Sequence, residues 1–230
     1  MGAKDDVSEA LRRIHGDPGR ISLAVCVPSG AHWSSAFGMS LALFFLYYSH
    51  HRVPGFLRQT VGLINVQSSL LHAARQRLVE EALIELHATH ILFVDSDQSF
   101  PPEVVHILAA SKKKVVGANV VTRMDPMLPC AVGLDGKKLW TRPDSHGIEE
   151  VSVCGTGVML IDTRVFGEIE KPFFLQIYGE ESGFVGEDVY FCRSLREKGI
   201  KVYVDHDLSK KVGHFGEARF DFSRAWESES

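Results

Sequence analysis

The first half of the chain alternates short apolar runs with longer segments of helical periodicity. The apolar runs, each expected to form a strand, are Ile21–Val27, Thr60–Val66, His90–Val94 and Val115–Val121. The helical segments between them are Ser34–Tyr48, Ser69–His87 and Glu103–Ala110. Strand–helix alternation of this kind favours a mainly parallel sheet flanked by helices, so we predict an α/β fold.

The second half of the chain has shorter elements and a mixed pattern. It begins with residues 125–150, which are rich in glycine, proline and aspartate. The strands expected after it are Val151–Cys154, Val158–Ile161 and Ile200–Val204. The helices expected there are Asp162–Ile169 and Glu187–Lys198, with a loop at Gly179–Val185 between them.

The domain organisation predicted from these elements is simple. We expect one domain over residues 21–216, preceded by a flexible lead-in at 1–20 with a short helix at Ser8–Ile14. A polar tail is expected at 217–230. A chain of 230 residues with 45% hydrophobic and 23% charged residues has the size and composition of one folded domain.

Composition narrows the class of protein further. The formal net charge of −4 does not indicate a general nucleic-acid-binding protein, although it leaves room for a local basic patch. The four cysteines form no CxxC pair, so we interpret them as reduced thiols in a cytoplasmic protein. The N-terminus lacks an apolar signal region. The apolar stretch Ala36–Tyr48 is shorter than the ~20 residues that span a bilayer, so we expect no transmembrane segment.

Two aspartates directly follow one of the predicted strands. Asp95 and Asp97 come after the apolar residues Ile91–Val94. In open α/β sheets, ligands bind at the carboxyl ends of the strands. Two carboxylates at that place can hold a hard divalent cation together with a ribose or phosphate. A loop that is merely acidic is the alternative, because a lone pair of this kind is common.

Acidic and histidine side chains later in the chain are further candidates. Glu187 and Asp188 open a predicted helix, where carboxylates are favoured by the helix dipole or could act as a general base. Their side chains should diverge by about 100°, so that only one points to a reaction centre. His214 lies between two glycines and could offer a neutral imidazole to a metal, or be an ordinary surface histidine.

A glycine-containing turn and two arginines complete the candidate residues. Gly155-Thr156-Gly157 follows a strand and would allow close approach of a ligand to the backbone, or form a simple hairpin turn. Arg75 and Arg77 lie in a helical segment and could meet a diphosphate, or belong to a solvated helix face.

The order of these segments resembles that of GT-A glycosyltransferases, which have a Rossmann-like fold. It is most similar to small bacterial and phage proteins related to the large family-two group. The segments that carry the resemblance are ILFVDSDQSFPP, VCGTGVMLID and GEDVYFCRSLREKG, and it covers about residues 21–216. Gln76 departs from the pattern, because the family often has Asn after Ala-Arg.

The resemblance implies a role for each candidate residue. On the donor side, Pro28 and Ser29 would receive the nucleotide base and ribose, with Arg75 nearby. Asp95 would touch the ribose and share in the metal site, whose ligands would be Asp97 and His214. On the acceptor side, the implied residues are Gly155, Thr156 and Gly157 as the floor, and Asp188 or its neighbour Glu187 as the catalytic acid pair. We expect Asp97 and His214 to approach each other, and Asp188 to be the general base.

The implied activity is metal-dependent transfer of a sugar from a nucleoside-diphosphate sugar to an acceptor hydroxyl. The resemblance implies Mn²⁺ or Mg²⁺ as the cofactor and a UDP-sugar as the commonest donor. The Glu187-Asp188 pair favours inversion at the anomeric carbon, while retention stays open because retaining GT-A enzymes share the same donor half. Open acceptors include a glycan, a lipid-linked carrier, a small molecule, a protein or a phage-type modified DNA base. A nucleotidyltransferase is one alternative, although its first loop would carry lysine or arginine and PSGAHWSS has neither. A catalytically silent nucleotide-sugar-binding module is the other.

Overall fold

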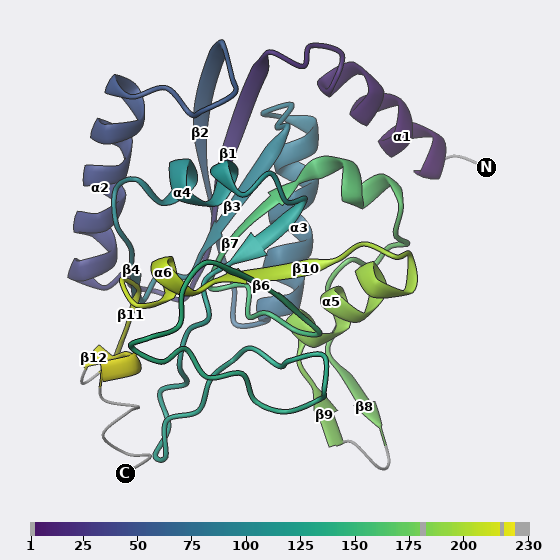
Figure 1. The fold of residues 1–230 in the computed structure, drawn as a ribbon. Helices are drawn as coiled ribbons and strands as arrows, with labels where there is room; N and C mark the ends of the chain where they lie inside the picture. Colours follow the sequence, from purple (N-terminus) through teal and green to yellow (C-terminus); the bar gives the residue numbers. More distant parts are fainter. Residues whose placement is uncertain (1–2, 180–182, 217–218, 224–230) are drawn as a thin grey trace.

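A seven-stranded sheet forms the centre of the protein in the computed structural model, which describes residues 3–179, 183–216 and 219–223 (Figure 1). Its strand order is β2-β1-β3-β7-β5-β10-β6. The strands are β1 (Arg20–Ser29), β2 (Arg58–Gln67), β3 (His90–Val94), β5 (Val115–Gly117), β6 (Ile148–Val151), β7 (Val158–Asp162) and β10 (Val202–Asp205). Pairs β2–β1, β1–β3 and β5–β10 are parallel, whereas β7 and β6 run antiparallel to their neighbours. The predicted α/β class is therefore confirmed, as a mixed sheet with a parallel core.

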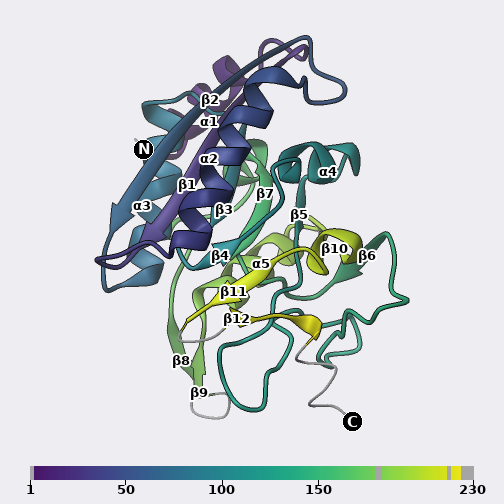
Figure 2. The same cartoon turned by 90° about the vertical axis from the view of Figure 1, so that its left-hand side faces the viewer.

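Helices cover both faces of this sheet (Figures 1 and 2). One hydrophobic cluster joins the sheet to α1 (Ala3–Ile14), α3 (Leu71–Ile84), the 3-10 turn η1 (Thr163–Gly167) and α5 (Glu187–Glu197). The opposite cluster joins it to α2 (Ser35–His50), α4 (Val104–Ala110) and α6 (His206–Ser209). The remaining strands form a small sheet of β4 (Gln98–Ser99), β11 (Gly213–Phe215) and β12 (Arg219–Phe220), and a hairpin of β8 (Ile177–Gly179) and β9 (Gly183–Val185).

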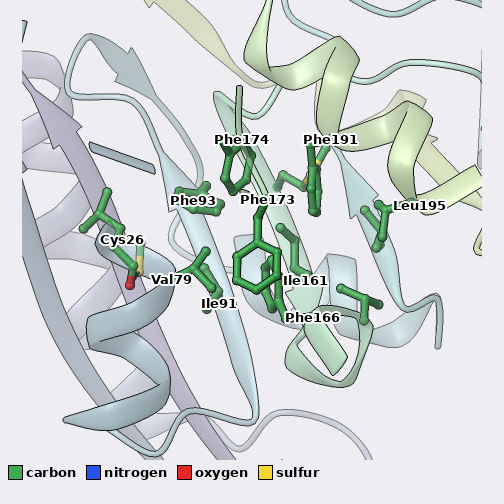
Figure 3. Packing of buried hydrophobic residues seen from close by; sticks show 14 of the residues in the cluster. Cys26, Val79, Ile91, Phe93, Ile161, Phe166, Phe173, Phe174, Phe191 and Leu195 are labelled. Carbon is green, nitrogen blue, oxygen red and sulfur yellow. Dashed lines mark hydrogen bonds between the residues drawn. The ribbon is translucent and has the colours of Figure 1, made fainter. Parts of the chain in front are cut away.

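Strand β3 shows how the sequence specifies these layers. Its side chains alternate, so that Ile91 and Phe93 enter one cluster while Leu92 and Val94 enter the other. Phe93 contacts Phe174 with ring centroids 5.6 Å apart, and further aromatic side chains continue the cluster into α5 (Figure 3). This packing joins α5 to β3.

Several boundaries differ from the sequence-based expectations. The short helix expected at Ser8–Ile14 ends where predicted but begins earlier, as α1, and its apolar Leu11 and Ile14 are buried. The proposed domain limits remain a prediction. The expected loop at Gly179–Val185 overlaps the β8–β9 hairpin in its described part. Strand β5 ends at Gly117 rather than Val121, and the strand expected at Val151–Cys154 lies three residues earlier, as β6.

The apolar segment near the start of the chain is a core helix. Phe37, Leu41 and Phe44 of α2 are buried against the sheet. Among the described helices, none combines the length and apolar character that crossing a membrane requires.

Candidate functional site

Asp95 lies at the carboxyl end of the central strand β3, as predicted. Its backbone N–H donates to the carbonyl oxygen of Gly157 (2.9 Å), which continues the β3–β7 pairing one step beyond the strand. The loop is also held from the other side, since the N–H of Ser34 donates to the carbonyl oxygen of Ser96 (2.9 Å). A Cβ atom at Gly157 would overlap the side-chain amide of buried Gln98, which would have to shift, so glycine favours this close approach.

Arg75 of α3 joins the two acidic segments that the sequence separates. Its Nη2 donates to Oδ1 of Asp95 (2.9 Å) and its Nε to Oε1 of Glu187 (3.2 Å). The side chain is only 2% exposed, and its guanidinium lies 5.5 Å from the centroid of the Phe93 ring. Burial disfavours the charge of Arg75, but the two carboxylates outweigh it and raise its pKa. The guanidinium of Arg75 is therefore engaged by carboxylates, whereas Arg77 lies on the solvated face.

Asp97 and His214 approach each other, which confirms the expected meeting of two distant segments. Oδ1 of Asp97 lies 3.4 Å from Nε2 of His214, and Oδ2 lies 3.0 Å from Nη1 of Arg123. Nδ1 of His214 lies 2.8 Å from the carbonyl oxygen of Val121, a contact that assigns its proton to Nδ1. A neutral His214 then presents the lone pair of Nε2 to Asp97.

The electrostatics of this pair follow from its contacts. Burial works against ionisation of Asp97, but His214 and Arg123 outweigh it and lower the pKa of Asp97. Burial likewise disfavours the charged form of His214, but Asp97 and the carbonyl oxygen of Val121 outweigh it and raise the pKa of His214. Asp97 is thus kept ionised, and in the absence of a cation its charge favours the protonated form of His214.

Asp97 and His214 could together hold a divalent cation. Oδ1 of Asp97 is buried and makes no hydrogen bond to the residues that the structure describes. Two ligands on adjacent positions of an octahedral ion lie about 3 Å apart, close to the separation seen here. In the described part of the chain no three His, Cys, Asp or Glu side chains are grouped for one ion, and the expected share of Asp95 in the metal site stays a prediction. Such an ion would complete its shell with water and ligand phosphates, as Mg²⁺ commonly does.

Glu187 and Asp188 point to different partners from the first turn of α5. Glu187 contacts Arg75, whereas Oδ1 of Asp188 accepts from the N–H of Val189 (2.7 Å). Oδ2 of Asp188 would lie 3.8 Å from a Cβ placed on Gly155, so the glycine turn lies beside this carboxylate. Burial and the nearby charge of Glu187 raise the pKa of Asp188.

The remaining predicted residues lie at the same edge of the sheet. Pro28 and Ser29 are the last residues of β1 rather than the start of a loop, and the Ser29 hydroxyl accepts from Nδ2 of Asn65 (2.9 Å). Thr156 is 2% exposed. The structure thus places every predicted site residue near the carboxyl ends of the strands, although it does not test their roles.

Unpartnered buried polar atoms concentrate at this edge. Six buried side-chain nitrogen or oxygen atoms of the described residues lack a hydrogen-bond partner. Four of them belong to Arg75, Asp97, Gln98 and Thr156. Buried polar atoms are rarely left without partners, so this concentration indicates a place where water, an ion or a ligand completes the bonding.

Sequence reasoning missed three side chains that shape the site. Arg123 faces Asp97 from a segment with no regular pattern, and Asn65 reaches Ser29 from the neighbouring strand. Gln98 directly follows Asp97 and is only 1% exposed. A polar residue at that place in the sequence did not suggest a buried side chain. Only its position next to Asp97 was a usable signal.

Comparisons with known proteins place the fold. No family model and no curated protein matches the sequence. The solved structure of A197 from STIV matches with a TM-score of 0.53 and 17% identity, over 85% of this chain and 86% of that one. The structure of GalNAc-T7 with UDP, GalNAc and Mn²⁺ matches with a TM-score of 0.52 and 14% identity, over 86% of this chain but 44% of that one. S. aureus TarS 1–349 gives a TM-score of 0.41 at 13% identity, over 81% of this chain and 58% of that one. At these identities the likeness shows the fold alone, and the chain has a GT-A-like α/β fold.

Proposed function

We propose that the chain is a metal-dependent glycosyltransferase that uses a nucleoside-diphosphate sugar, with UDP-sugar as the first donor to test. The observation that carries the proposal is the pairing of Asp97 with His214 at 3.4 Å across 117 residues of sequence. The unpartnered polar atoms beside this pair support a ligand site there. The GT-A-like fold supports it too, since GalNAc-T7 was solved with UDP and Mn²⁺.

The donor half of the site consists of Asp97, His214 and the residues around Asp95. Asp97 and His214 would hold Mn²⁺ or Mg²⁺, which when bound would neutralise charge on the departing diphosphate. Asp95 would accept a hydrogen bond from the donor ribose through the carboxylate oxygen that Arg75 leaves free. Pro28 and Ser29 end β1 at the same edge of the sheet and would contact the nucleotide.

The proton step is assigned to Asp188. A base must be ionised, lie near the acceptor and have a pKa suited to accepting a proton. Burial raises the pKa of Asp188, whereas Glu187 is held by Arg75 and acts as a positioning residue. Asp188 would take the proton of the acceptor hydroxyl as that oxygen attacks the anomeric carbon from the face opposite the leaving group. Transfer would then invert the anomeric configuration.

Thermal shift with Mn²⁺ and a panel of nucleotide sugars tests the donor half. A ligand that binds the native state raises the melting temperature, and more so the higher its affinity. At a free ligand concentration a hundred times Kd, the native state is stabilised by about 2.7 kcal/mol. We expect a shift with UDP-sugar and Mn²⁺ that is lost in Asp97→Asn and in His214→Asn. The matched control is His32→Asn, which changes an exposed histidine of the chain.

Product analysis separates this proposal from its rivals. Release of nucleoside diphosphate, by hydrolysis or transfer, supports a glycosyltransferase. Release of pyrophosphate identifies a nucleotidyltransferase and overturns the proposal. Donor binding without turnover under any acceptor would identify a binding module instead.

A further inference from the structure

A second cavity lies at the opposite edge of the sheet, beside the amino ends of β1 and β3. Its volume is about 390 Å³, within the range of small-molecule sites. Residues from five separate segments line it, including Arg20 at the start of β1, His90 at the start of β3 and Lys112 after α4. No residue of the proposed transferase site contributes to this lining.

The carboxylates of this cavity are already neutralised. Asp17 is paired with Arg58 and also accepts from the N–H of Gly19 (3.0 Å). Asp162 accepts from Nε of Arg164 with both oxygens, at 2.9 and 3.0 Å. These contacts satisfy the two acidic side chains of the lining, so neither can neutralise a further cation.

Cationic side chains remain without such partners. Arg20 and Lys112 are exposed and, within the described residues, contact no carboxylate. Lys113 lies 4.5 Å from the ring centroid of Tyr203, a contact that leaves its charge uncompensated. The cavity therefore carries a local positive charge in a chain whose net charge is −4.

The deeper wall of the cavity is neutral and partly aromatic. Burial lowers the pKa of His90 to about 4, and it also lowers the pKa of His15, so both imidazoles are uncharged near neutral pH. His15 contacts Oγ1 of Thr163 (2.8 Å) and His90 contacts Oγ1 of Thr89 (3.0 Å), which leaves one ring nitrogen of each available. The ring of Phe56 lies edge-on to His90, with centroids 5.6 Å apart.

We propose that this cavity binds a small phosphorylated molecule, separately from the transferase site. Its phosphoryl oxygens would be bound by Arg20, Lys112 and Lys113, because these are the charges that the protein leaves unpaired. The rest of the ligand would lie against Phe56 and the two neutral imidazoles. A cavity with a partly apolar wall favours a small ligand over a polymer, which would need only the exposed cations.

Histidine NMR on the full chain tests the site with pyrophosphate as the probe, in buffer that contains EDTA. The imidazole C–H signals of His15 and His90 report on this cavity and are assigned with His15→Asn and His90→Asn. The signal of His214 reports on the other edge of the sheet. We expect saturable shifts of the first two signals and no shift of the His214 signal.

A double variant ties the shifts to the unpaired cations. Arg20→Gln with Lys112→Gln should raise the Kd for pyrophosphate about tenfold or more. Lys137→Gln with Lys138→Gln removes two exposed charges elsewhere and should leave it unchanged. Thermal melts of both double variants establish that they are folded.

Three results overturn the proposal. The first is the absence of shifts for His15 and His90 up to about 10 mM pyrophosphate, a concentration that reveals even millimolar affinity. The second is an affinity that the Arg20 and Lys112 changes leave intact. The third is tighter binding of a single-stranded oligonucleotide at the same signals, since a neighbouring cavity of about 280 Å³ shares Lys112–Lys114 and would extend the cationic surface for a polymer.

Discussion

The two edges of the central sheet differ in which polar and charged groups lack a partner. At the carboxyl ends of the strands, acidic side chains gather around Arg75 and buried polar atoms are left without partners. At the amino ends, Asp17 and Asp162 are satisfied and cations are left over. The difference shows that charge alone does not identify a site. The informative signal is which groups the folded chain fails to satisfy.

Removing the proposed base should have the largest effect, a loss of transfer activity, and should affect only the site at the carboxyl ends of the strands. Asp188→Asn keeps the shape but removes the proton acceptor, so transfer should fall by about 10²–10⁴-fold while donor binding persists. Because the folded state raises the pKa of Asp188, its ionised form is disfavoured there, and the variant should melt at a higher temperature at neutral pH. Steady-state kinetics and calorimetry measure the two effects.

The neighbouring acid provides the control for that prediction. Full activity in Asp188→Asn together with its loss in Glu187→Gln would reverse the assignment within the pair. If both variants kept full activity, the proton would leave by another route, and a retaining mechanism would become the better interpretation.

Arg75 should be the main contributor to stability at the acidic edge. Arg75→Met leaves Asp95 and Glu187 facing each other without their shared cation, which should lower the free energy of unfolding by about 3 kcal/mol or more. Arg77→Met, on the same helix but solvated, should change it by less than about 0.5 kcal/mol. Urea denaturation compares the two, and equal effects would mean that burial of Arg75 carries no special weight.

The amino-end edge should lose stability in mild acid. The folded state lowers the pKa of His90 from its ordinary value near 6.5 to about 4, so the unfolded chain binds the proton more readily. Stability should therefore fall as the pH drops from about 6.5 to about 4, by at most about 3 kcal/mol for this residue. His90→Gln should flatten that part of the pH–stability curve, whereas His50→Gln, which changes an exposed residue of α2, should not. An unchanged curve for His90→Gln would place the titration elsewhere.

A single methyl group at the glycine turn should have the smallest effect of the four. In Gly157→Ala the new Cβ would overlap the amide of buried Gln98, which should cost about 1–3 kcal/mol of folding free energy and displace the acidic loop. Gly38→Ala meets nothing within 4 Å and lies inside a helix, so it should be neutral or stabilising. Melting temperatures and donor affinity of both variants test the difference.

Local patterns predicted the strands and the acidic loop well. The bounds expected for β3, His90–Val94, agree with the structure because a buried strand is a short apolar run with clear ends. The helix that begins at Glu187 was also placed correctly, since acidic residues and a preceding glycine mark its start.

What the sequence could not show was which elements pair across long distances. Nothing local reveals that β7 runs antiparallel between β3 and β5, because that order depends on the whole sheet. The β8–β9 hairpin was missed because its strands are only three residues long. The contact of Arg123 with Asp97 joins an irregular segment to the loop after β3, so no periodicity of the sequence predicts it.

The shared cation of Asp95 and Glu187 also constrains how the protein can change. Replacing Arg75 leaves two carboxylates without their shared cation, and replacing either carboxylate leaves a buried N–H of Arg75 without its acceptor, so the three should vary together in evolution rather than singly. In a library that randomises Glu187 alone, variants would be lost to misfolding before any new acceptor could be tested. If Arg75 and Glu187 are changed as a pair, or both are kept while exposed neighbours are varied, the variants stay folded and can be compared by their activity.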